Sequence, residues 1–598
     1  MGRHIAKFTS LCVLVITLNS GVGAQSGSGD TNEEPTRTGA IKGRVVNESG
    51  RPLANVSVSV RAYGSVGQSR VTTTDSEGNF QVRDLDPLSY QVSAWAPTYT
   101  TPPRDPNNHQ VTYYRVGNSV RLELVKGGVI TGMVTSRTGE PVIAVRVRAE
   151  MIRDSNGQRA RYRAFFKERT TDDRGIYRLY GLPQGTYVVS AGGIGSSPYG
   201  RSAFDIDAPT YAPSSTRNDA VEINVGSGQE IANVDIRYRG EPGHVVSGSV
   251  IGPAPGSGTT VNITSVLNGV SQSTYSIFQQ PGNTGFAIYG VPDADYDVTA
   301  QLFLPGGEWG FSDPKRIKVK GADITGLELV IKPLGSIKGR VVLEESKTPE
   351  CKGKLRPSFG EMLVMPSINE KGEAKDRRTL FVGSPTVPDK QGDFSVRNMG
   401  AGEYHFSARF FAKYWYLRSI TLPSQVNAPS TVNASSTVNV PSTVNALSRP
   451  SNSSVDLARN WTVVKSGDRI SGLTITLAEG AASFRGSVRP AEGETLPARI
   501  NVHLIPAEKE KVEDVLRFFT VAADVDGKFS VTNVPPGRYL ALATVMSDHE
   551  STAMSKLRLP DEGEARGKLR LQAQATKTEI ELKPCQNLID YQLSLKER

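Results

Sequence analysis

Four acidic side chains crowd into one short stretch near the start of the chain, "TDSEGNFQVRDLDPLSYQVSA", which runs from Thr74 to Ala94. Carboxylates at this density can bind a hard cation such as calcium, and a carboxylate pair can act as general acid and base. Tight turns also use Asp and Gly, because Asp accepts hydrogen bonds from nearby amides and Gly adopts positive φ. The acids are Asp75, Glu77, Asp84 and Asp86.

The same stretch returns four more times, beginning at Thr171, Asn283, Pro388 and Ala523, so the chain contains five copies of one unit. Each copy has an aromatic residue, a tyrosine ten positions later and an alanine fourteen positions later. The aromatic residues are Phe80, Tyr177, Phe286, Phe394 and Phe529; the tyrosines are Tyr90, Tyr187, Tyr296, Tyr404 and Tyr539; the alanines are Ala94, Ala191, Ala300, Ala408 and Ala543.

The copies separate the acids from the framework. Glu77 is replaced by Arg174, Gln391 and Asp526 in other copies. A carboxylate needed for metal binding or catalysis would not vary so freely among equivalent positions. The residues equivalent to Asp84 are Gly181, Gly290, Asn398 and Asn533, all of which accept a left-handed backbone. We therefore predict a hairpin in which Asp75, Gly78 and Asp84 shape turns while Phe80, Tyr90 and Ala94 fill a core.

Further strands frame each hairpin. A Gly-x-Val strand precedes it, beginning with Gly43 and Val45 in the first copy, and an alternating apolar strand such as Leu122 to Leu124 closes it. In the last copy we expect the closing strand at Ile580 to Leu582. Period-two alternation buries one face of each strand, which predicts an all-β tandem array of about five antiparallel β-sandwich modules.

The succession of Gly-x-Val, Gly-x-Pro-Leu-x-x-Val, Asp-x-x-Gly-x-Phe and Leu-x-Pro-Gly-x-Tyr resembles the carboxypeptidase regulatory-like domain. The first two copies match this pattern most fully, and the later ones keep the hairpin and outer strands. The resemblance implies a transthyretin-like (prealbumin-like) sandwich of about seven strands. It does not imply peptidase activity, because such domains accompany many exported proteins.

The expected organisation follows from these repeats and from composition breaks. The segments are a signal peptide at 1–24, a linker at 25–38, module 1 at 39–126, module 2 at 127–242, module 3 at 243–334, module 4 at 335–479 with a low-complexity insert at 424–460, module 5 at 480–585 and a C-terminal tail at 586–598.

The N-terminus has the basic, apolar and small-residue regions of a secretory signal, so we expect export with cleavage after Ala24. Removing Arg3 and Lys7 leaves 67 basic against 60 acidic residues, a net charge of +7 instead of +9. Basic residues are interspersed with acids, which argues against nucleic-acid binding, and no other apolar run could span a membrane. Cys351 and Cys585 remain in the mature chain, and whether they form a disulfide stays open.

No pattern points to catalysis. The six histidines are scattered and none has an acid three residues later, so no zinc-ligand motif is present. The sequence also has neither a Gly-x-Ser-x-Gly elbow nor a phosphate loop ending in Gly-Lys-Ser/Thr. We expect no enzyme activity, no cofactor and no metal.

Aromatic residues on loops are the remaining candidates for contact with a ligand. "APTY" occurs in modules 1 and 2, and a tryptophan lies among glycines in "LPGGEWGFSDP". Such rings can stack on sugars or anchor a protein, although a loop tyrosine can equally plug the end of its own sandwich. The candidates are Tyr99, Tyr211, Trp309, Tyr414 and Trp415. The last two continue a strand-like run from Phe406, which favours a position partly in the core.

These patterns lead to two expectations for function. The first is an exported, non-enzymatic binding or scaffold protein of the cell envelope or exterior, with polysaccharide as the first ligand to test and an envelope protein as the other partner. The second is a purely structural spacer or a protein-protein adhesion module. An accessory part of a hydrolase system is a remote third. The sequence does not indicate the oligomeric state.

Overall fold

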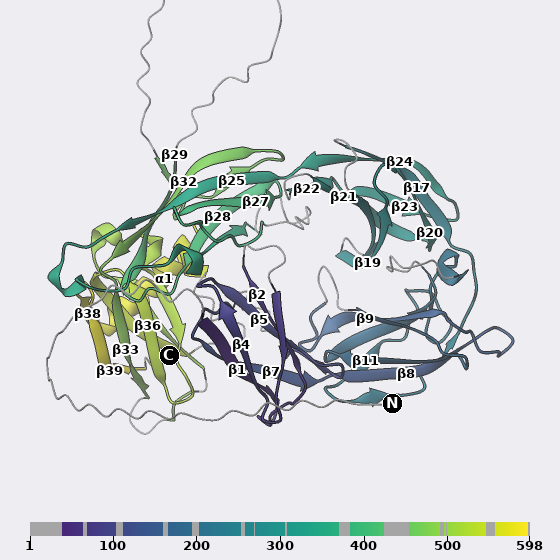
Figure 1. Cartoon of the computed structure of the whole chain (residues 1–598), viewed down its shortest axis with the longest axis horizontal. Coiled ribbons are helices and arrows are strands. Elements are labelled where there is room, and N and C mark those ends of the chain that lie inside the picture. The colour runs from purple at the N-terminus through teal and green to yellow at the C-terminus, as the bar shows by residue number, and fades with distance from the viewer. Residues whose placement is uncertain are drawn as a thin grey trace, which may run out of the picture. The chain divides into compact units, whose positions relative to one another are not determined.

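The computed structural model describes residues 39–63, 69–102, 112–159, 166–193, 203–252, 258–267, 270–304, 308–369, 383–423, 454–490, 495–497, 499–545 and 556–595. The expected signal peptide and linker lie outside these residues. The described residues form an all-β array of β-sandwich modules, as the sequence predicts. In Figure 1 each module takes a narrow range of the colour scale, because each is formed by one continuous segment of chain.

The strands follow one another in the same order in each module. Module 1 has β1 (Gly39–Asn47), β2 (Ser57–Ala62), β3 (Ser69–Thr73), β4 (Asn79–Leu85), β5 (Tyr90–Trp95), β6 (Tyr99–Thr100) and β7 (Ser119–Lys126). Module 2 has β8 (Gly128–Thr135), β9 (Arg146–Asp154), β10 (Phe166–Thr170), β11 (Ile176–Leu182), β12 (Gly185–Ala191), η1 (Ala203–Ile206), β13 (Thr210–Tyr211), β14 (Ile223–Val225), β15 (Glu230–Ile231) and β16 (Ile236–Arg237). Module 3 has β17 (His244–Ile251), β18 (Thr259–Leu267), β19 (Val270–Gln279), β20 (Gly285–Val291), β21 (Ala294–Leu304), β22 (Glu308–Ser312), β23 (Lys315–Val319) and β24 (Ile324–Pro333).

The last two modules carry short helices as well. Module 4 has β25 (Gly335–Glu344), η2 (Pro349–Cys351), η3 (Phe359–Glu361), β26 (Leu363–Ile368), β27 (Asp393–Met399), β28 (Gly402–Arg409), β29 (Trp415–Pro423), β30 (Ser454–Asp456), β31 (Thr462–Val464) and β32 (Arg469–Glu479). Module 5 has β33 (Ala482–Arg489), β34 (Ile500–Pro506), η5 (Lys509–Lys511), η6 (Val515–Arg517), β35 (Phe519–Ala522), β36 (Lys528–Val534), β37 (Gly537–Val545), η7 (Lys556–Arg558), α1 (Gly563–Thr576), β38 (Glu579–Leu582) and β39 (Asn587–Ser594).

Two sheets pack face to face in modules 1, 2, 4 and 5, and one long sheet folds over its own core in module 3. A separate cluster of buried apolar residues fills each module. The sheets are β4-β1-β7-β6 and β3-β2-β5; β11-β8-β15 with β16, and β10-β9-β12-β13 with β14; β19-β18-β21-β22-β24-β17-β20 with β23; β27-β25-β32-β29-β30 and β26-β28-β31; and β36-β33-β39 and β35-β34-β37-β38.

The pairing is mixed rather than wholly antiparallel. The Gly-x-Val strand pairs antiparallel with the first hairpin strand and parallel with the closing strand, as β1 does with β4 and β7. The same arrangement recurs around β8, β17, β25 and β33. These parallel pairs correct the expectation of wholly antiparallel sheets. The closing strand of each module runs in the same direction as the first strand, beside which it lies.

The glycine of Gly-x-Val lies directly across from the hairpin aromatic in every module. A Cβ at this glycine would collide with the ring or hydroxyl of that aromatic, or with a carbonyl oxygen of the closing strand, or with both. The glycine therefore makes room for a ring over the backbone and for close approach of the parallel strand. The pairs are Gly43 and Phe80, Gly132 and Tyr177, Gly248 and Phe286, Gly339 and Phe394, and Gly486 and Phe529.

The repeated tyrosine forms a corner in every module. Its ring lies in the core, and its hydroxyl donates a hydrogen bond to the carbonyl oxygen four residues earlier, at 2.7 to 2.9 Å. This bond closes the turn between the two hairpin strands and satisfies the only polar atom of a buried side chain. The tyrosines are Tyr90, Tyr187, Tyr296, Tyr404 and Tyr539.

The acids of the opening stretch shape turns. Asp75 Oδ1 accepts hydrogen bonds from the backbone N–H groups of Glu77, at 2.9 Å, and Asn79, at 2.8 Å, while Gly78 has a φ of 73°. Asp84 has a φ of 55°, and its four equivalents also lie in the left-handed region. The φ values are 71° at Gly181, 72° at Gly290, 60° at Asn398 and 59° at Asn533.

The repeated alanine varies in burial. Ala191, Ala300 and Ala543 are fully buried, whereas Ala94 and Ala408 are partly buried and pack against their cores.

Two segments differ from the expected organisation. Strand β39 pairs in parallel with β33, so residues 587–594 close module 5 and are not a tail. The expected closing strand, Ile580 to Leu582, lies in β38 and pairs with β37 instead. In module 4 the expected insert ends early, because β30 pairs with β29 and Leu457 and Ala458 are buried. Residues 424–453 lie outside the described residues.

Cys351 and Cys585 form a disulfide between η2 of module 4 and the loop before β39 of module 5, with their Cα atoms 5.4 Å apart. The hydrogen bond from the Cys585 N–H to the Gly480 carbonyl, at 3.0 Å, holds that loop against the start of module 5. The pairing that the sequence leaves open is present, and it joins two modules covalently.

Candidate functional site

The outer face of module 3 carries an exposed group of aromatic side chains. Along β21 the residues Val298, Ala300 and Leu302 are buried in the core, so Gln301 and Phe303 point outward. Trp309 lies directly across from Phe303, and Phe311 directly across from Gln301, on the neighbouring strand β22. The hairpin β21–β22 therefore presents three rings on one surface.

The three rings are close enough to contact the same ligand. The centroids of Phe303 and Trp309 are 5.1 Å apart in an edge-to-face arrangement, and those of Trp309 and Phe311 are 6.3 Å apart. Phe303 is 44% exposed, whereas Trp309 and Phe311 are partly exposed. The Trp309 backbone N–H donates to Asn398 Oδ1 of module 4 at 2.8 Å, which fixes the backbone beneath the ring.

Polar side chains continue the same surface across the sheet. Thr260 pairs with Gln301 on one side and with Phe278 on the other, and Phe278 is 53% exposed. Lys332 on β24 lies across from Phe311 and forms an ion pair with Asp313. We call the set Thr260, Phe278, Gln301, Phe303, Trp309, Phe311 and Lys332 the aromatic face.

The other aromatic candidates are less accessible. Tyr211 is 4% exposed, with Arg217 over its ring, and Trp415 is 1% exposed in the core of module 4. The burial of Tyr211 favours the alternative that it plugs its own sandwich, and the burial of Trp415 agrees with the expectation that its cluster is partly core. Tyr99 lies in β6 and packs partly against the core of module 1, so it covers the end of its own sandwich. Tyr414 packs against the core of module 4 and lies beneath Lys354.

Four exposed rings among the described residues are not among the predicted candidates: Trp95, Phe278, Tyr289 and Phe303. Trp95 is 62% exposed at the end of β5, and Phe303 is the most exposed ring of the β21–β22 hairpin. Both lie at odd steps from the repeated alanine, Ala94 and Ala300 respectively, so strand alternation already predicts that they point outward.

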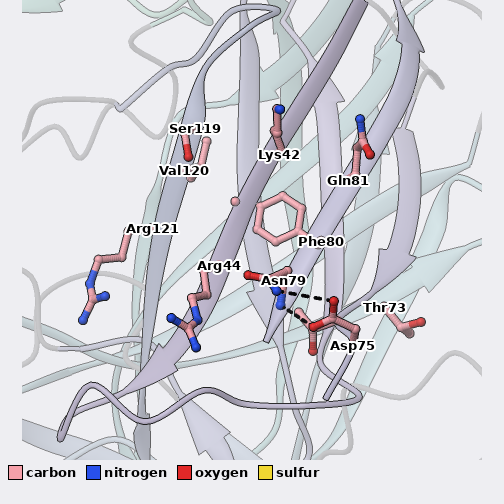
Figure 2. Close-up of a pocket in the computed structure, with 12 residues that line it drawn as sticks. Lys42, Arg44, Thr73, Asp75, Asn79, Phe80, Gln81, Ser119, Val120 and Arg121 are labelled. Carbon is pink, nitrogen blue, oxygen red and sulfur yellow. Dashed lines mark hydrogen bonds between the residues drawn. The ribbon is translucent and has the colours of Figure 1, made fainter. Parts of the chain in front are cut away.

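A second surface, which we call the basic groove, lies on module 1 and holds about 690 Å³. Lys42 and Arg44 project from β1, and Arg121 projects from β7 beside Arg44. Figure 2 shows the guanidinium groups of Arg44 and Arg121 on neighbouring strands and the hydrogen bonds between Asp75 and Asn79 at the groove edge. Arg44 Nε donates to the Glu77 carbonyl at 2.8 Å, and its Nη2 lies 3.8 Å from the Glu77 carboxylate, so this guanidinium is already partly engaged.

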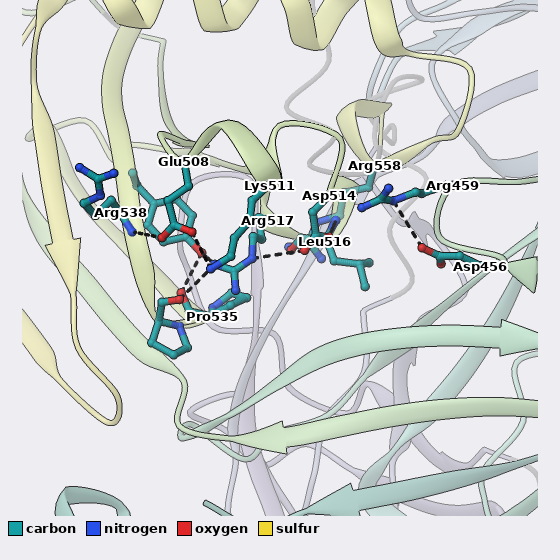
Figure 3. A network of polar contacts seen from close by, with 12 residues as sticks. Asp456, Arg459, Glu508, Lys511, Asp514, Leu516, Arg517, Pro535, Arg538 and Arg558 are labelled. Carbon is teal, nitrogen blue, oxygen red and sulfur yellow. Dashed lines mark hydrogen bonds and ion pairs between the residues drawn. The ribbon is translucent and has the colours of Figure 1, made fainter. Parts of the chain in front are cut away.

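A polar network in module 5 has a structural role. The Arg517 Nη1 donates to the Pro536 carbonyl at 3.0 Å and to the Tyr539 hydroxyl at 3.2 Å, while Nε pairs with Asp514 at 3.2 Å. Figure 3 shows this arginine between Asp514 and the turn at Pro535. The network anchors the tyrosine corner to η6, and it contains no group arranged for reaction with a substrate.

Within the described residues, no cluster of three or more His, Cys, Asp or Glu side chains has the geometry to hold a metal ion. No helix in the same part of the chain combines the length and the apolar character needed to cross a bilayer.

Solved structures with low sequence identity to the chain include a Bacillus anthracis protein and two bacterial pilins. The Bacillus anthracis TIE protein is 12% identical with a TM-score of 0.13; the match covers 50% of this chain and 51% of that protein, so the chain spans about half its length. The minor pilin GBS52 of Streptococcus agalactiae is 13% identical with a TM-score of 0.18, covering 33% of this chain and 95% of the pilin. The shaft pilin SpaA of Lactobacillus rhamnosus GG is 13% identical with a TM-score of 0.17, covering 34% and 97%.

TM-scores this low support no conclusion about this chain. No curated protein is significantly similar to it. The family model of the carboxypeptidase regulatory-like domain matches residues 40–113, which contain β1 to β5 and the first tyrosine corner. The resemblance that the sequence motifs indicate is thereby confirmed: module 1 carries a carboxypeptidase regulatory-like domain.

Proposed function

We propose that this chain is an exported, non-enzymatic array of β-sandwich modules that binds a polysaccharide through the aromatic face of module 3. The observation that carries the proposal is the cluster of Phe303, Trp309 and Phe311, which are clustered on one outward strand surface instead of being buried. Exposed aromatic side chains gathered in this way are uncommon on a soluble domain without a partner.

The chemistry of the surface fits a sugar chain. Aromatic rings cover the apolar faces of pyranose units, and the Gln301 amide, the Thr260 hydroxyl and the Lys332 ammonium can hydrogen-bond sugar hydroxyls between the rings. A row of residues that crosses several strands is long enough to contact more than one sugar unit. The disulfide between modules 4 and 5 also supports export, because disulfides persist in oxidising compartments.

Affinity electrophoresis in gels containing a panel of neutral and acidic polysaccharides tests this proposal. The parent chain should be retarded by at least one polysaccharide, and Phe303→Ala combined with Trp309→Ala should lower the affinity about tenfold or more, since each ring contributes about 1 kcal/mol. Trp95→Ala is the matched control, because it removes an exposed ring from module 1. Equal retardation of all variants, or of none, would contradict the proposal.

A scaffold function is the second candidate, and the contacts between neighbouring modules favour it. Asn533 Nδ2 of module 5 donates to the Ala412 and Trp415 carbonyls of module 4, at 2.7 and 2.8 Å, next to a covalent disulfide. Such links hold modules in fixed relation without any ligand. In that case deletion of a module abolishes function, whereas the Phe303 and Trp309 variants keep it.

A further inference from the structure

A cavity of about 270 Å³ lies where module 5 covers the outer face of strand β28. Tyr404 and Phe406 point into the core of module 4, so the alternating residues His405 and Ser407 point outward into the cavity wall. Leu516 and Phe519 of module 5 form the opposite apolar wall. The cavity is separate from the aromatic face and from the basic groove.

The Nε2 atom of His405 is buried and lacks a hydrogen-bond partner among the described residues. The residue as a whole is 6% exposed. Burial, assisted by the positive charge of Arg558, lowers the pKa of His405 to about 4, so the imidazole is neutral at physiological pH. A buried imidazole nitrogen without a partner costs free energy, which a ligand that bonds to it would recover.

Arg558 supplies a positive charge to the same cavity. Its Nε donates to the Phe518 carbonyl at 2.9 Å and its Nη2 to the Leu516 carbonyl at 3.3 Å, while the guanidinium lies 4.4 Å from the centroid of the Phe519 ring. Burial lowers the pKa of Arg558 to about 10, so it remains charged. Figure 3 shows Arg558 beside Asp514, but the Asp514 carboxylate forms its ion pair with Arg517 and not with Arg558.

Three of the five N–H groups of Arg558, both on Nη1 and one on Nη2, have no hydrogen-bond partner among the described residues and can bond to a ligand. No carboxylate among the described residues forms an ion pair with Arg558, and its Nη1 makes no hydrogen bond there. A guanidinium in an apolar wall binds a carboxylate strongly, because the charge-assisted hydrogen bonds form away from bulk water. We propose that this cavity binds a small organic carboxylate, whose charged end meets Arg558 and His405 and whose apolar end packs against Leu417, Leu516 and Phe519.

Thermal-shift and calorimetric titrations of the full chain with acetate, butyrate, benzoate and phenylacetate test the proposal, with benzamide and benzyl alcohol as neutral analogues. At least one carboxylate should bind and raise the unfolding midpoint, and its neutral analogue should bind about tenfold more weakly or not at all. Absence of binding by all four carboxylates, or equal binding of acid and amide, would overturn it.

Variants assign the binding to this cavity. Arg558→Met should lower the affinity for the carboxylate about tenfold or more, whereas Arg538→Met, which removes an exposed arginine paired with Glu579, should leave it unchanged. Ser407→Leu places an apolar side chain in the cavity and keeps both Arg558 and His405. This variant should also abolish binding, and it provides the test if Arg558→Met does not fold. Unchanged affinity in Ser407→Leu would place the carboxylate elsewhere and refute the assignment.

Discussion

The residue that identifies each module most clearly is the corner tyrosine. Five tyrosines separated by about a hundred residues make the same hydrogen bond to the carbonyl four positions earlier. Burial raises the pKa of Tyr90 to about 12, with the nearby Asp86 carboxylate adding to the effect. The neutral hydroxyl is therefore part of the folded state of module 1.

Replacing Tyr90 with Phe should destabilise module 1 by about 1 kcal/mol at neutral pH, because the Asp86 carbonyl loses its donor. The folded pKa lies above the ordinary value, so the tyrosine stabilises the fold below pH 10 and this contribution is lost as the pH rises toward 12. Hydrogen exchange of β4 and β5, followed against pH by mass spectrometry, measures both effects.

The parent should therefore lose protection in β4 and β5 more steeply above pH 10 than Tyr90→Phe does. Tyr99→Phe is the control, because its hydroxyl makes no hydrogen bond with the described residues of module 1. Parallel alkaline profiles for the parent and Tyr90→Phe would show that the buried hydroxyl does not carry the effect.

The repeat predicts the backbone conformation of single residues well. It predicts the burial of the aromatic candidates only in part. The exchange of Asp84 for Gly and Asn in other copies predicts a left-handed backbone, and all five residues have φ between 55° and 72°. In contrast, the sequence leaves open whether Tyr211 contacts a ligand or plugs the end of its own sandwich, and the side chain is 4% exposed. Its burial depends on chain segments distant in sequence, which local composition does not reveal. The strand-like run before Trp415 indicates a position partly in the core, and this side chain is 1% exposed.

Among the elements, the first strand of each module has the most constrained position, because it pairs on both sides. Strand β33 lies between β36 and β39, with Gly486 across from Phe529 and beside the Tyr591 carbonyl. The glycine is thus required by strand packing and not by a special backbone angle. This gives a physical reason for the Gly-x-Val motif in all five modules.

Gly486→Ala should destabilise module 5 by about 3 kcal/mol, since the added methyl overlaps the backbone of β39 and the ring of Phe529. Gly567→Ala is the control in the same module. It lies in α1 with open space around its Cα, and there alanine should stabilise by up to about 1 kcal/mol. Chemical denaturation, monitored by hydrogen exchange in β33 and β36, measures the free energy of unfolding of both variants. Equal stability of the two variants would refute this role of the glycine.

The sequence predicts the hairpins better than the closing strands. Each hairpin is local, with turn residues and core positions within about twenty residues of one another. The closing strand must return over a long distance, and two alternating segments compete for the place at the end of module 5. The nearer one, at Ile580 to Leu582, pairs with β37, and Asn587–Ser594 takes the position beside β33.

At the scale of the whole molecule, the disulfide joins residues 234 positions apart and adds a second covalent link between two modules that the chain connects by a short junction. Non-reducing peptide mapping of the purified, exported protein should yield a linked peptide containing Cys351 and Cys585. Alkylation of both thiols without prior reduction would show that the pair is open and would remove the support it gives to export.

The proposal that the aromatic face binds a polysaccharide concerns the whole molecule, because two surfaces of different chemistry compete for the role. Hydrogen-exchange mass spectrometry of the full chain, with and without a polysaccharide that retards it, compares them in one experiment. Our account predicts protection in residues 294–304 and 308–312, with none of comparable size around Lys42 and Arg121. Protection confined to the basic groove, or no protection in module 3, would contradict it.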